Sequence, residues 1–139
     1  MKIMFRIMAA FQIWLYRLTG GKLGGQMRGF KVLLLTTRGR KSGKTYITPL
    51  GCFDNEAGYV IVASNAGLPS NPSWYYNLKS NPQVTVQVLD KVMPTTAEVL
   101  SGEARAQAWR QVIATAPSYV NYEKRTTREI PLILLRPIK

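Results

Sequence analysis

A basic turn at residues 37–44 is the first part of this sequence whose residue types and spacing suit chemistry. It carries four cations and two glycines: Arg38, Arg40, Lys41, Lys44, Gly39 and Gly43. Cations and main-chain N–H groups gathered in one turn are what proteins use to hold phosphate. The spacing of a Walker phosphate loop is absent. The turn is therefore either an anion-binding loop or a solvated hairpin tip.

A small polar loop followed by aromatic residues forms a second candidate site. Residues 63–67 are small and polar, and residues 71–78 bring Trp74 and Tyr75 into a short helix. Small residues let a flat ring approach the main chain, and aromatic side chains give that ring a stacking wall. The alternative interpretation is that Trp74 and Leu78 simply anchor the helix to the core.

Two tyrosines, Tyr119 and Tyr122, form a third candidate. They are three residues apart, so they share one face if this segment is helical. Their hydroxyl groups suit the orientation of a substrate carbonyl or the supply of a proton. The structural alternative is a pair of half-exposed loop tyrosines.

The chain contains no histidine and a single cysteine, Cys52. These counts exclude a Ser-His-Asp hydrolase, a histidine-ligated metal site and an internal disulfide. We expect no metal site. Chemistry has to come from a bound cofactor or from Tyr, Ser, Lys or carboxylate side chains.

The formal net charge of +12 is concentrated towards the N-terminus. Residues 1–53 contain ten Lys or Arg and no acid, and the first acid is Asp54. The rest of the chain holds nine bases against seven acids, so it is almost balanced. Such a field attracts phosphate groups on a ligand, a nucleic acid or a membrane surface.

Apolar periodicity and turn residues divide the chain into short elements. Strands are predicted over 31–37, 45–53, 59–64, 83–89, 92–100 and 130–135, and helices over 2–18, 73–79 and 101–116. Residues 117–128 indicate a loop or a short helix. We expect Asn71 to cap the second helix, with Pro72 at its first position, and Ser101 to cap the third.

This order of elements predicts an α+β fold built on a small antiparallel barrel of about six strands with peripheral helices. We expect the whole chain, residues 1–139, to form a single domain. Residues 1–25 would supply an N-terminal amphipathic helix and a glycine-rich connector, and residues 30–137 the barrel.

Several segments, in order and with matching spacing, resemble the deazaflavin-dependent nitroreductase family of actinobacteria. The segments that carry the resemblance are 32–43, 48–50, 62–67, 71–82, 117–119 and 127–131. The ordered set, which extends over about residues 12–137, is more specific than any motif alone. The resemblance implies a split β-barrel related to FMN-binding oxidoreductases. It also implies coenzyme F420, a deazaflavin that carries a phosphate and an oligoglutamate tail.

The resemblance further implies which residues hold this coenzyme. Those on the phosphate and tail side are Arg40, Lys41, Ser42, Gly43 and Lys44. Those that line the cofactor are Tyr46, Ile47, Thr48, Pro49, Leu50, Val62, Ala63, Ser64, Asn65, Ser73, Trp74, Tyr75, Asn77 and Tyr119, and Tyr122 falls near the substrate. Relatives commonly carry an arginine where this chain has Tyr46, and we expect Lys44 to compensate.

The resemblance implies hydride transfer from reduced F420 to an electron-poor acceptor such as a quinone, a nitroaromatic or an activated enone. Ser64, Tyr119 and Tyr122 are the candidates for polarising the acceptor or relaying a proton. The alternatives are the same barrel with FMN or haem, and a protein that carries F420 without turning it over. A nucleic-acid-binding domain is the non-enzymatic alternative, although no known motif for it occurs.

The N-terminal helix admits two interpretations. Its apolar run at residues 7–16 is interrupted by Gln12 and is far shorter than the ~20 residues that a membrane span needs. The helix either packs on the barrel as a lid or lies on an anionic membrane, where a quinone is found. We expect a cytoplasmic protein, with peripheral contact at the inner face of the membrane through residues 1–18 under the second interpretation. A homodimer is one option for its oligomeric state.

Overall fold

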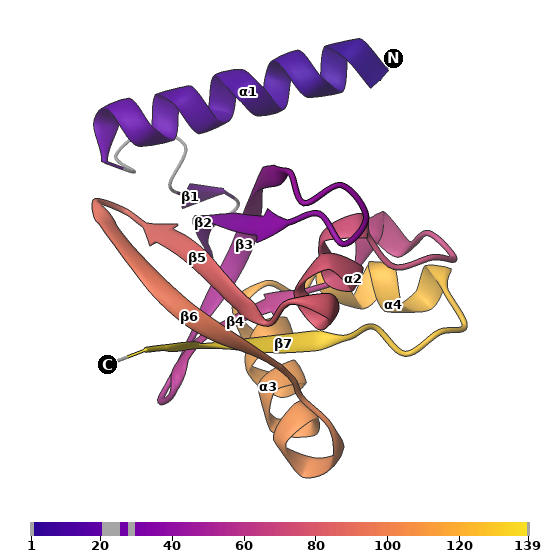
Figure 1. Cartoon of the computed structure of the whole chain (residues 1–139). Coiled ribbons are helices and arrows are strands. Elements are labelled where there is room, and N and C mark those ends of the chain that lie inside the picture. The colour runs from indigo at the N-terminus through magenta and orange to yellow at the C-terminus, as the bar shows by residue number, and fades with distance from the viewer. Residues whose placement is uncertain (1, 21–25, 28–29, 139) are drawn as a thin grey trace.

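The computed structural model describes residues 2–20, 26–27 and 30–138 of the chain. Its strands are β1 (Gln26–Met27), β2 (Phe30–Arg38), β3 (Thr45–Asn55), β4 (Gly58–Val62), β5 (Gln83–Val88), β6 (Lys91–Val99) and β7 (Leu132–Pro137). Its helices are α1 (Lys2–Thr19), α2 (Ser73–Ser80), α3 (Gly102–Thr115) and α4 (Tyr119–Arg125), with a short 3-10 turn, η1 (Asn65–Gly67). Figure 1 shows these elements around one central sheet.

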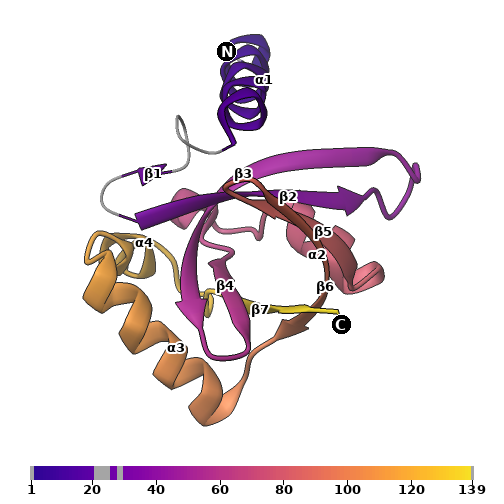
Figure 2. The same ribbon diagram turned by 90° about the vertical axis from the view of Figure 1, so that its left-hand side faces the viewer.

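The sheet closes into a barrel at β2. All its pairings are antiparallel in the order β1-β2-β3-β4-β7-β6-β5, and β2 also pairs with β5. Strands β2 to β7 therefore form a closed ring, which Figure 2 shows nearly end-on. This arrangement confirms the predicted α+β fold on an antiparallel barrel of about six strands.

One hairpin extends beyond the ring. The β2–β3 ladder runs as far as the pair Arg38↔Thr45, whereas the β2–β5 ladder stops at Thr36↔Thr85. The end of the β2–β3 hairpin therefore projects past β5, as Figure 2 shows. Pro49 lies in the part of β3 that pairs with β2 alone, which fits its lack of a main-chain N–H group.

The continuous apolar run in β2 is explained by burial on both faces. Leu33 and Leu35 point into the barrel interior, whereas Val32 and Leu34 lie outside, in the cluster that contains Tyr16 of α1. Successive side chains of a strand point to opposite faces. A strand covered on one face only would alternate between apolar and polar residues, as β5 does with Val84, Val86 and Val88 buried.

Helices contribute side chains to two further buried clusters, one inside the barrel and one on its outer face. Trp74, Tyr75 and Leu78 of α2 pack into the barrel interior. Helices α3 and α4 cover the outside of β4 and β7, where Trp109 and Tyr119 lie in a second buried cluster. Figures 1 and 2 show α3 on the side of the barrel away from α1.

Tyr16 anchors the C-terminal part of helix α1 on the barrel, and Ile13 packs beside it. Tyr16 is fully buried; its hydroxyl donates to the carbonyl of Gln87 (3.2 Å) and accepts from the N–H of Leu89 (2.7 Å). Burial raises the pKa of Tyr16 above its ordinary value, although the bond from Leu89 opposes this effect. The C-terminal part of α1 is thus packed against the barrel, as the first interpretation of this helix expects.

Two capping predictions need correction. Helix α2 begins at Ser73 with Pro72 at its N-cap, so Asn71 is not the cap; its side-chain oxygen accepts a hydrogen bond from Arg128 instead. Ser101 does occupy the N-cap of α3, but its hydroxyl makes no capping bond. The segment predicted as a loop or short helix is helical over Tyr119–Arg125.

Candidate functional site

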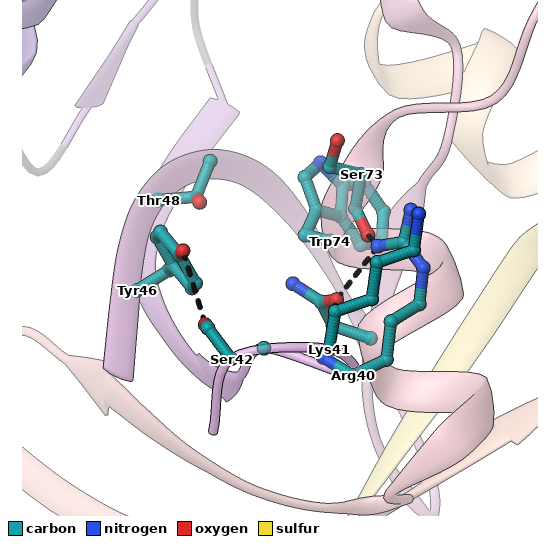
Figure 3. Close-up of a pocket in the computed structure, with 9 residues that line it drawn as sticks. Arg40, Lys41, Ser42, Tyr46, Thr48, Ser73 and Trp74 are labelled. Atoms are coloured by element: carbon teal, nitrogen blue, oxygen red, sulfur yellow. Dashed lines mark hydrogen bonds between the residues drawn. The ribbon is translucent and has the colours of Figure 1, made fainter. Parts of the chain in front are cut away.

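A cavity of about 390 Å³ lies between the projecting β2–β3 hairpin and α2. Its lining residues are Gly39, Arg40, Lys41, Ser42, Tyr46, Thr48, Ser73, Trp74 and Asn77. Figure 3 shows the hairpin residues Tyr46 and Thr48 facing Ser73 and Trp74 across the cavity. The sequence separates these two walls by about thirty residues, and the closure of the barrel brings them together.

The hairpin turn is shaped by its glycines. Main-chain bonds join the N–H of Gly39 to the carbonyl of Lys44 (2.7 Å) and the N–H of Gly43 to the carbonyl of Gly39 (2.9 Å). A Cβ atom on Gly39 would lie 2.7 Å from Ser42 Oγ and 2.8 Å from the ring of Tyr46. Any larger residue at position 39 would therefore require the side chains of Ser42 and Tyr46 to move.

Arg40 fastens the turn to α2. Its Nη1 donates to Asn77 Oδ1 (2.8 Å) and to the carbonyl of Ser73 (3.4 Å), and its main-chain N–H also donates to Asn77 Oδ1 (3.2 Å). The guanidinium group lies 5.3 Å from the centre of the Tyr76 ring. Asn77 is buried, so its side-chain oxygen needs these donors.

The cavity is cationic and acid-free. Lys41 and Arg40 are exposed at its rim, and none of the lining residues is Asp or Glu. Tyr46 is half exposed, and its hydroxyl lies 3.4 Å from Ser42 Oγ. These groups offer positive charge, hydroxyl groups and an aromatic face within one volume, which suits a flat ligand with an anionic end.

The comparisons with known proteins agree on one family. The family model for F420H(2)-dependent quinone reductase matches residues 8–137. The chain belongs to this family. An F420H(2)-dependent quinone reductase of Mycobacterium tuberculosis is 38% identical over 125 residues, which are 87% of this chain and 84% of that protein. The expectation of an actinobacterial F420-dependent oxidoreductase family is thereby confirmed.

Solved structures carry the same fold. An F420-H2-dependent reductase is 42% identical with a TM-score of 0.71, covering 78% of this chain and 95% of that one. A chain described as a domain-swapped dimer is 41% identical with a TM-score of 0.72, covering 80% and 82%. The haem storage protein HutZ of Vibrio cholerae, at 17% identity and a TM-score of 0.62, shares the fold alone.

The cavity of this quinone reductase family member gathers many of the residues expected to hold the coenzyme. Arg40, Lys41, Ser42, Tyr46, Thr48, Ser73, Trp74 and Asn77 all line it. Lys44 and Gly43 belong to the same turn but are not lining residues. The N–H of Lys44 donates to Ser42 Oγ (3.2 Å), and its side chain is exposed.

Other expected residues lie elsewhere. Ile47 packs beneath α1, and Leu50 and Tyr75 belong to the barrel interior. Pro49 pairs with Leu34 in the β2–β3 ladder. Val62 is buried in the cluster under α3 and α4. None of these side chains is among those that line the 390 Å³ cavity.

Of the three candidate catalytic residues, Tyr119 and Tyr122 belong to α4, and Ser64 directly precedes η1. Tyr119 is buried against Phe53 and Tyr122, with ring centres 5.7 and 5.4 Å away. The two tyrosines thus share a face of α4, as their spacing predicts. Ser64 precedes η1, followed by Asn65. Ala63 is the buried residue before them. This second group is separate from the cavity lining.

Arg128 is the residue that sequence reasoning missed. Its guanidinium donates to four different residues of the connection between β4 and α2, namely Ala63, Ser64, Leu68 and Asn71. Arg128 lies in one of the segments that carry the family resemblance, but nothing in its sequence position indicates what it contacts. The sequence shows that Arg128 is part of a family-like segment, but only the folded structure shows which residues it bonds.

Cys52 takes no visible part in the site. It is buried in the barrel interior. Burial, with a smaller contribution from Asp54, raises the pKa of its thiol to about 12. A thiol in this environment stays protonated at neutral pH and is a poor nucleophile.

Proposed function

We propose that this protein transfers a hydride from reduced coenzyme F420 to a quinone. The observation that carries the proposal is the acid-free cavity whose lining includes the cations Arg40 and Lys41, the hydroxyl group of Ser42 and the aromatic ring of Trp74. Membership of the F420H(2)-dependent quinone reductase family supports the cofactor and the acceptor class. The same family supports no alternative with FMN or haem.

The residues of the cavity fit the coenzyme. A volume of about 390 Å³ lies in the range of ligand cavities, roughly 300–1,000 Å³. The basic turn offers the charge-assisted donors that a phosphate and a polyanionic tail require. When bound, reduced F420 supplies the hydride from its deazaflavin ring.

Each group of residues then has its own task. Arg40, Lys41 and Ser42 bind the anionic end, and Arg40 also holds the turn against α2 through Asn77. Trp74 forms a wall for the ring. We assign to Ser64, Tyr119 and Tyr122 the orientation of the acceptor and the movement of its proton, because the two tyrosines share a face of α4 and Ser64 directly precedes η1, against which α4 packs. Substrate orientation of this kind lowers the barrier by fixing the reacting atoms face to face.

The experiment that tests this function mixes the purified protein with reduced F420 and a panel of acceptors. The panel contains menaquinone, a nitroimidazole and an activated enone, and oxidation of the deazaflavin is followed by absorbance. We expect menaquinone to accelerate the oxidation most. Tight F420 binding without acceleration by any acceptor would favour an F420 carrier. Titration with FMN and haem serves as the cofactor control.

We also propose that α1 brings the protein to an anionic membrane at the inner face of the cell membrane. Phe11, Trp14 and Leu18 are more than half exposed and fall at helical spacing on one stripe, and Arg17 beside them is exposed. No helix among the described residues combines the length and the apolar character that crossing a membrane requires. Sedimentation with anionic and with zwitterionic vesicles, using wild type and Trp14→Gln, tests the contact.

A homodimer is the assembly we propose, because a relative 41% identical to this chain is described as a domain-swapped dimer. Light scattering of the protein as it elutes from a size-exclusion column measures its molar mass and tests this assembly directly. A monomer at every concentration would contradict this assembly without affecting the proposed reaction.

A further inference from the structure

The guanidinium group of Arg128 is almost entirely occupied by neutral oxygen atoms of one loop. Nη1 donates to Asn71 Oδ1 (2.6 Å) and to the carbonyl of Ala63 (3.3 Å). Nη2 donates to the carbonyls of Ser64 (2.8 Å) and Ala63 (3.3 Å), and Nε donates to the carbonyl of Leu68 (3.1 Å). Across residues 2–20, 26–27 and 30–138, no carboxylate forms an ion pair with it.

The loop that Arg128 holds is strained. Asn65 (φ 47°), Ala66 (φ 56°) and Gly67 (φ 77°) adopt left-handed conformations in succession. Glycine adopts this region freely and asparagine tolerates it, so the steric penalty falls mainly on Ala66. Two such residues side by side persist only where the surroundings stabilise them. Main-chain bonds within the loop, from Gly67 to Ser64 and from Leu68 to Asn65, contribute to this stabilisation. Further contributions come from the bond from Asn65 Nδ2 to the carbonyl of Ser70 (2.9 Å) and from the bonds of Arg128 to residues on either side of the strained positions.

This loop leads directly into the wall of the cavity. Asn71, the residue bonded to Arg128, is two residues before Ser73, where α2 begins. Ser73, Trp74 and Asn77 of that helix line the cavity. The direction in which α2 starts therefore depends on how Asn71 is held.

Arg128 also belongs to the segment that carries the tyrosines. It lies three residues after the end of α4, and its own N–H donates to Thr126 Oγ1 (3.3 Å). Helix α4 packs against η1, where a Cβ on Gly67 would lie 2.8 Å from Arg125 Cβ. Arg128 thus joins the end of β4, the start of α2 and the C-terminal end of α4.

We infer that Arg128 is a positioning residue that fixes the tyrosine helix α4 relative to the α2 wall of the cavity by holding the strained 63–71 loop. This inference rests on the proposed function for its catalytic consequence, because the two parts it joins would hold the acceptor and the coenzyme. Its structural part stands independently of any ligand.

The first test measures amide hydrogen exchange of the ligand-free protein by mass spectrometry. In Arg128→Gln we expect exchange to quicken by about tenfold or more in peptides that cover residues 63–77 and 119–127. The matched control is Arg110→Gln, which removes an exposed arginine of α3 that pairs with Glu103; it should leave those peptides unchanged. Equal exchange in Arg128→Gln and wild type would overturn the inference.

The second test separates positioning from general stability. At a temperature where all variants are folded, Arg128→Gln should raise the F420 dissociation constant about tenfold and lower kcat for menaquinone reduction. Arg128→Lys should recover only part of this loss, because a single ammonium group cannot reach acceptors on both sides of the loop. A lower melting temperature with wild-type binding and kcat would overturn the inference.

A pair of milder variants keeps the inference testable if Arg128→Gln does not fold. Asn71→Ala removes one acceptor and should quicken exchange in residues 63–77, whereas Asn71→Asp keeps the acceptor and adds an ion pair, so it should not. Unchanged exchange in Asn71→Ala would contradict the inference. If wild type fails to bind F420, the proposed function fails, and the exchange experiments still decide the role of Arg128.

Discussion

The region around Arg40 and the region around Arg128 both contact the segment from Ala63 to Asn77, and they use positive charge differently. At the cavity, Arg40 and Lys41 are exposed, and only part of the Arg40 guanidinium is bonded, through Nη1. Around η1, every nitrogen of the Arg128 guanidinium donates to a protein oxygen. The comparison teaches that the first charge is available to a ligand, as the proposed function requires, whereas the second is bonded to the loop.

Removing the cavity charge should have the largest effect. Arg40→Ala with Lys41→Ala should raise the F420 dissociation constant by tenfold or more, since each charge-assisted contact contributes about 1.5–3 kcal/mol. Fluorescence titration at constant ionic strength measures it. The control is Lys91→Ala with Lys124→Ala, two exposed lysines that do not line the cavity. An equal loss in the control would mean that binding depends on total charge alone.

Filling the rim of the cavity should have the next largest effect. Gly39→Ala places a Cβ against the side chains of Ser42 and Tyr46, which must then move away from their positions at the cavity. We expect weaker F420 binding, by about fivefold or more, measured by the same titration. Gly43→Asn is the matched control, because a Cβ there meets nothing within 4 Å and asparagine tolerates the left-handed conformation. Wild-type binding in Gly39→Ala would show that this rim is not part of the site.

Loosening α1 should change stability and leave the cavity intact. Tyr16→Phe removes both hydrogen bonds to the β5–β6 turn and should lower the free energy of unfolding by about 1 kcal/mol. Urea denaturation measures this loss. F420 binding should not change, because Tyr16 lies on the outer face of β2. A large loss of F420 affinity would indicate that α1 supports the cavity.

The same tyrosine gives a pH dependence of defined sign. Its pKa is raised in the folded protein, so its stabilising effect is complete below about pH 10, where the unfolded tyrosine is still protonated. Above that pH the unfolded state loses its proton first, and stability falls. Unfolding measured from pH 8 to pH 11 should show a shallower decline in Tyr16→Phe. If the free energy of unfolding fell equally with pH in wild type and in Tyr16→Phe, Tyr16 would not be the source of this pH dependence.

The smallest effect is expected at Cys52. Its buried thiol, with a pKa of about 12, should react with a disulfide reagent at pH 8 only as fast as the protein unfolds. Absorbance of the released thiolate measures the rate, and the denatured protein is the control. Rapid labelling of the folded protein would mean that the barrel interior opens readily.

Much of the fold could be predicted from the sequence because its signals are local. The alternation of Val84, Val86 and Val88 with polar residues is sufficient to predict β5 as a strand buried on one face. The run from Val32 to Leu35 indicates a strand covered on both faces. The capping of α2 by Asn71 was wrong because a competing partner, Arg128, is 57 residues away. A helix cap can be predicted from neighbouring residues only when no distant donor takes its side chain.

The candidate site divides in the same way. The turn around Arg40 and Lys41 could be found from composition, because four cations between two strands are visible in the sequence. The contact of Arg40 with Asn77, and the meeting of Tyr46 with Trp74 across one cavity, require the closed barrel. Ile47 alternates with the lining residues Tyr46 and Thr48 along β3 and faces α1. Leu50 shares the face of the lining residues but lies further along the strand, in the barrel interior. A contiguous prediction therefore includes side chains that lie outside the cavity.

The most direct test of the account compares two ligands on two proteins. The ligands are F420 and the same deazaflavin chromophore without phosphate and tail; the proteins are wild type and Arg40→Ala with Lys41→Ala. We predict that wild type binds F420 at least tenfold more tightly than the shortened chromophore, and that the double variant loses this preference. Equal binding of both ligands to wild type, or an unchanged preference in the variant, would contradict the claim that this cavity holds the anionic end of the coenzyme.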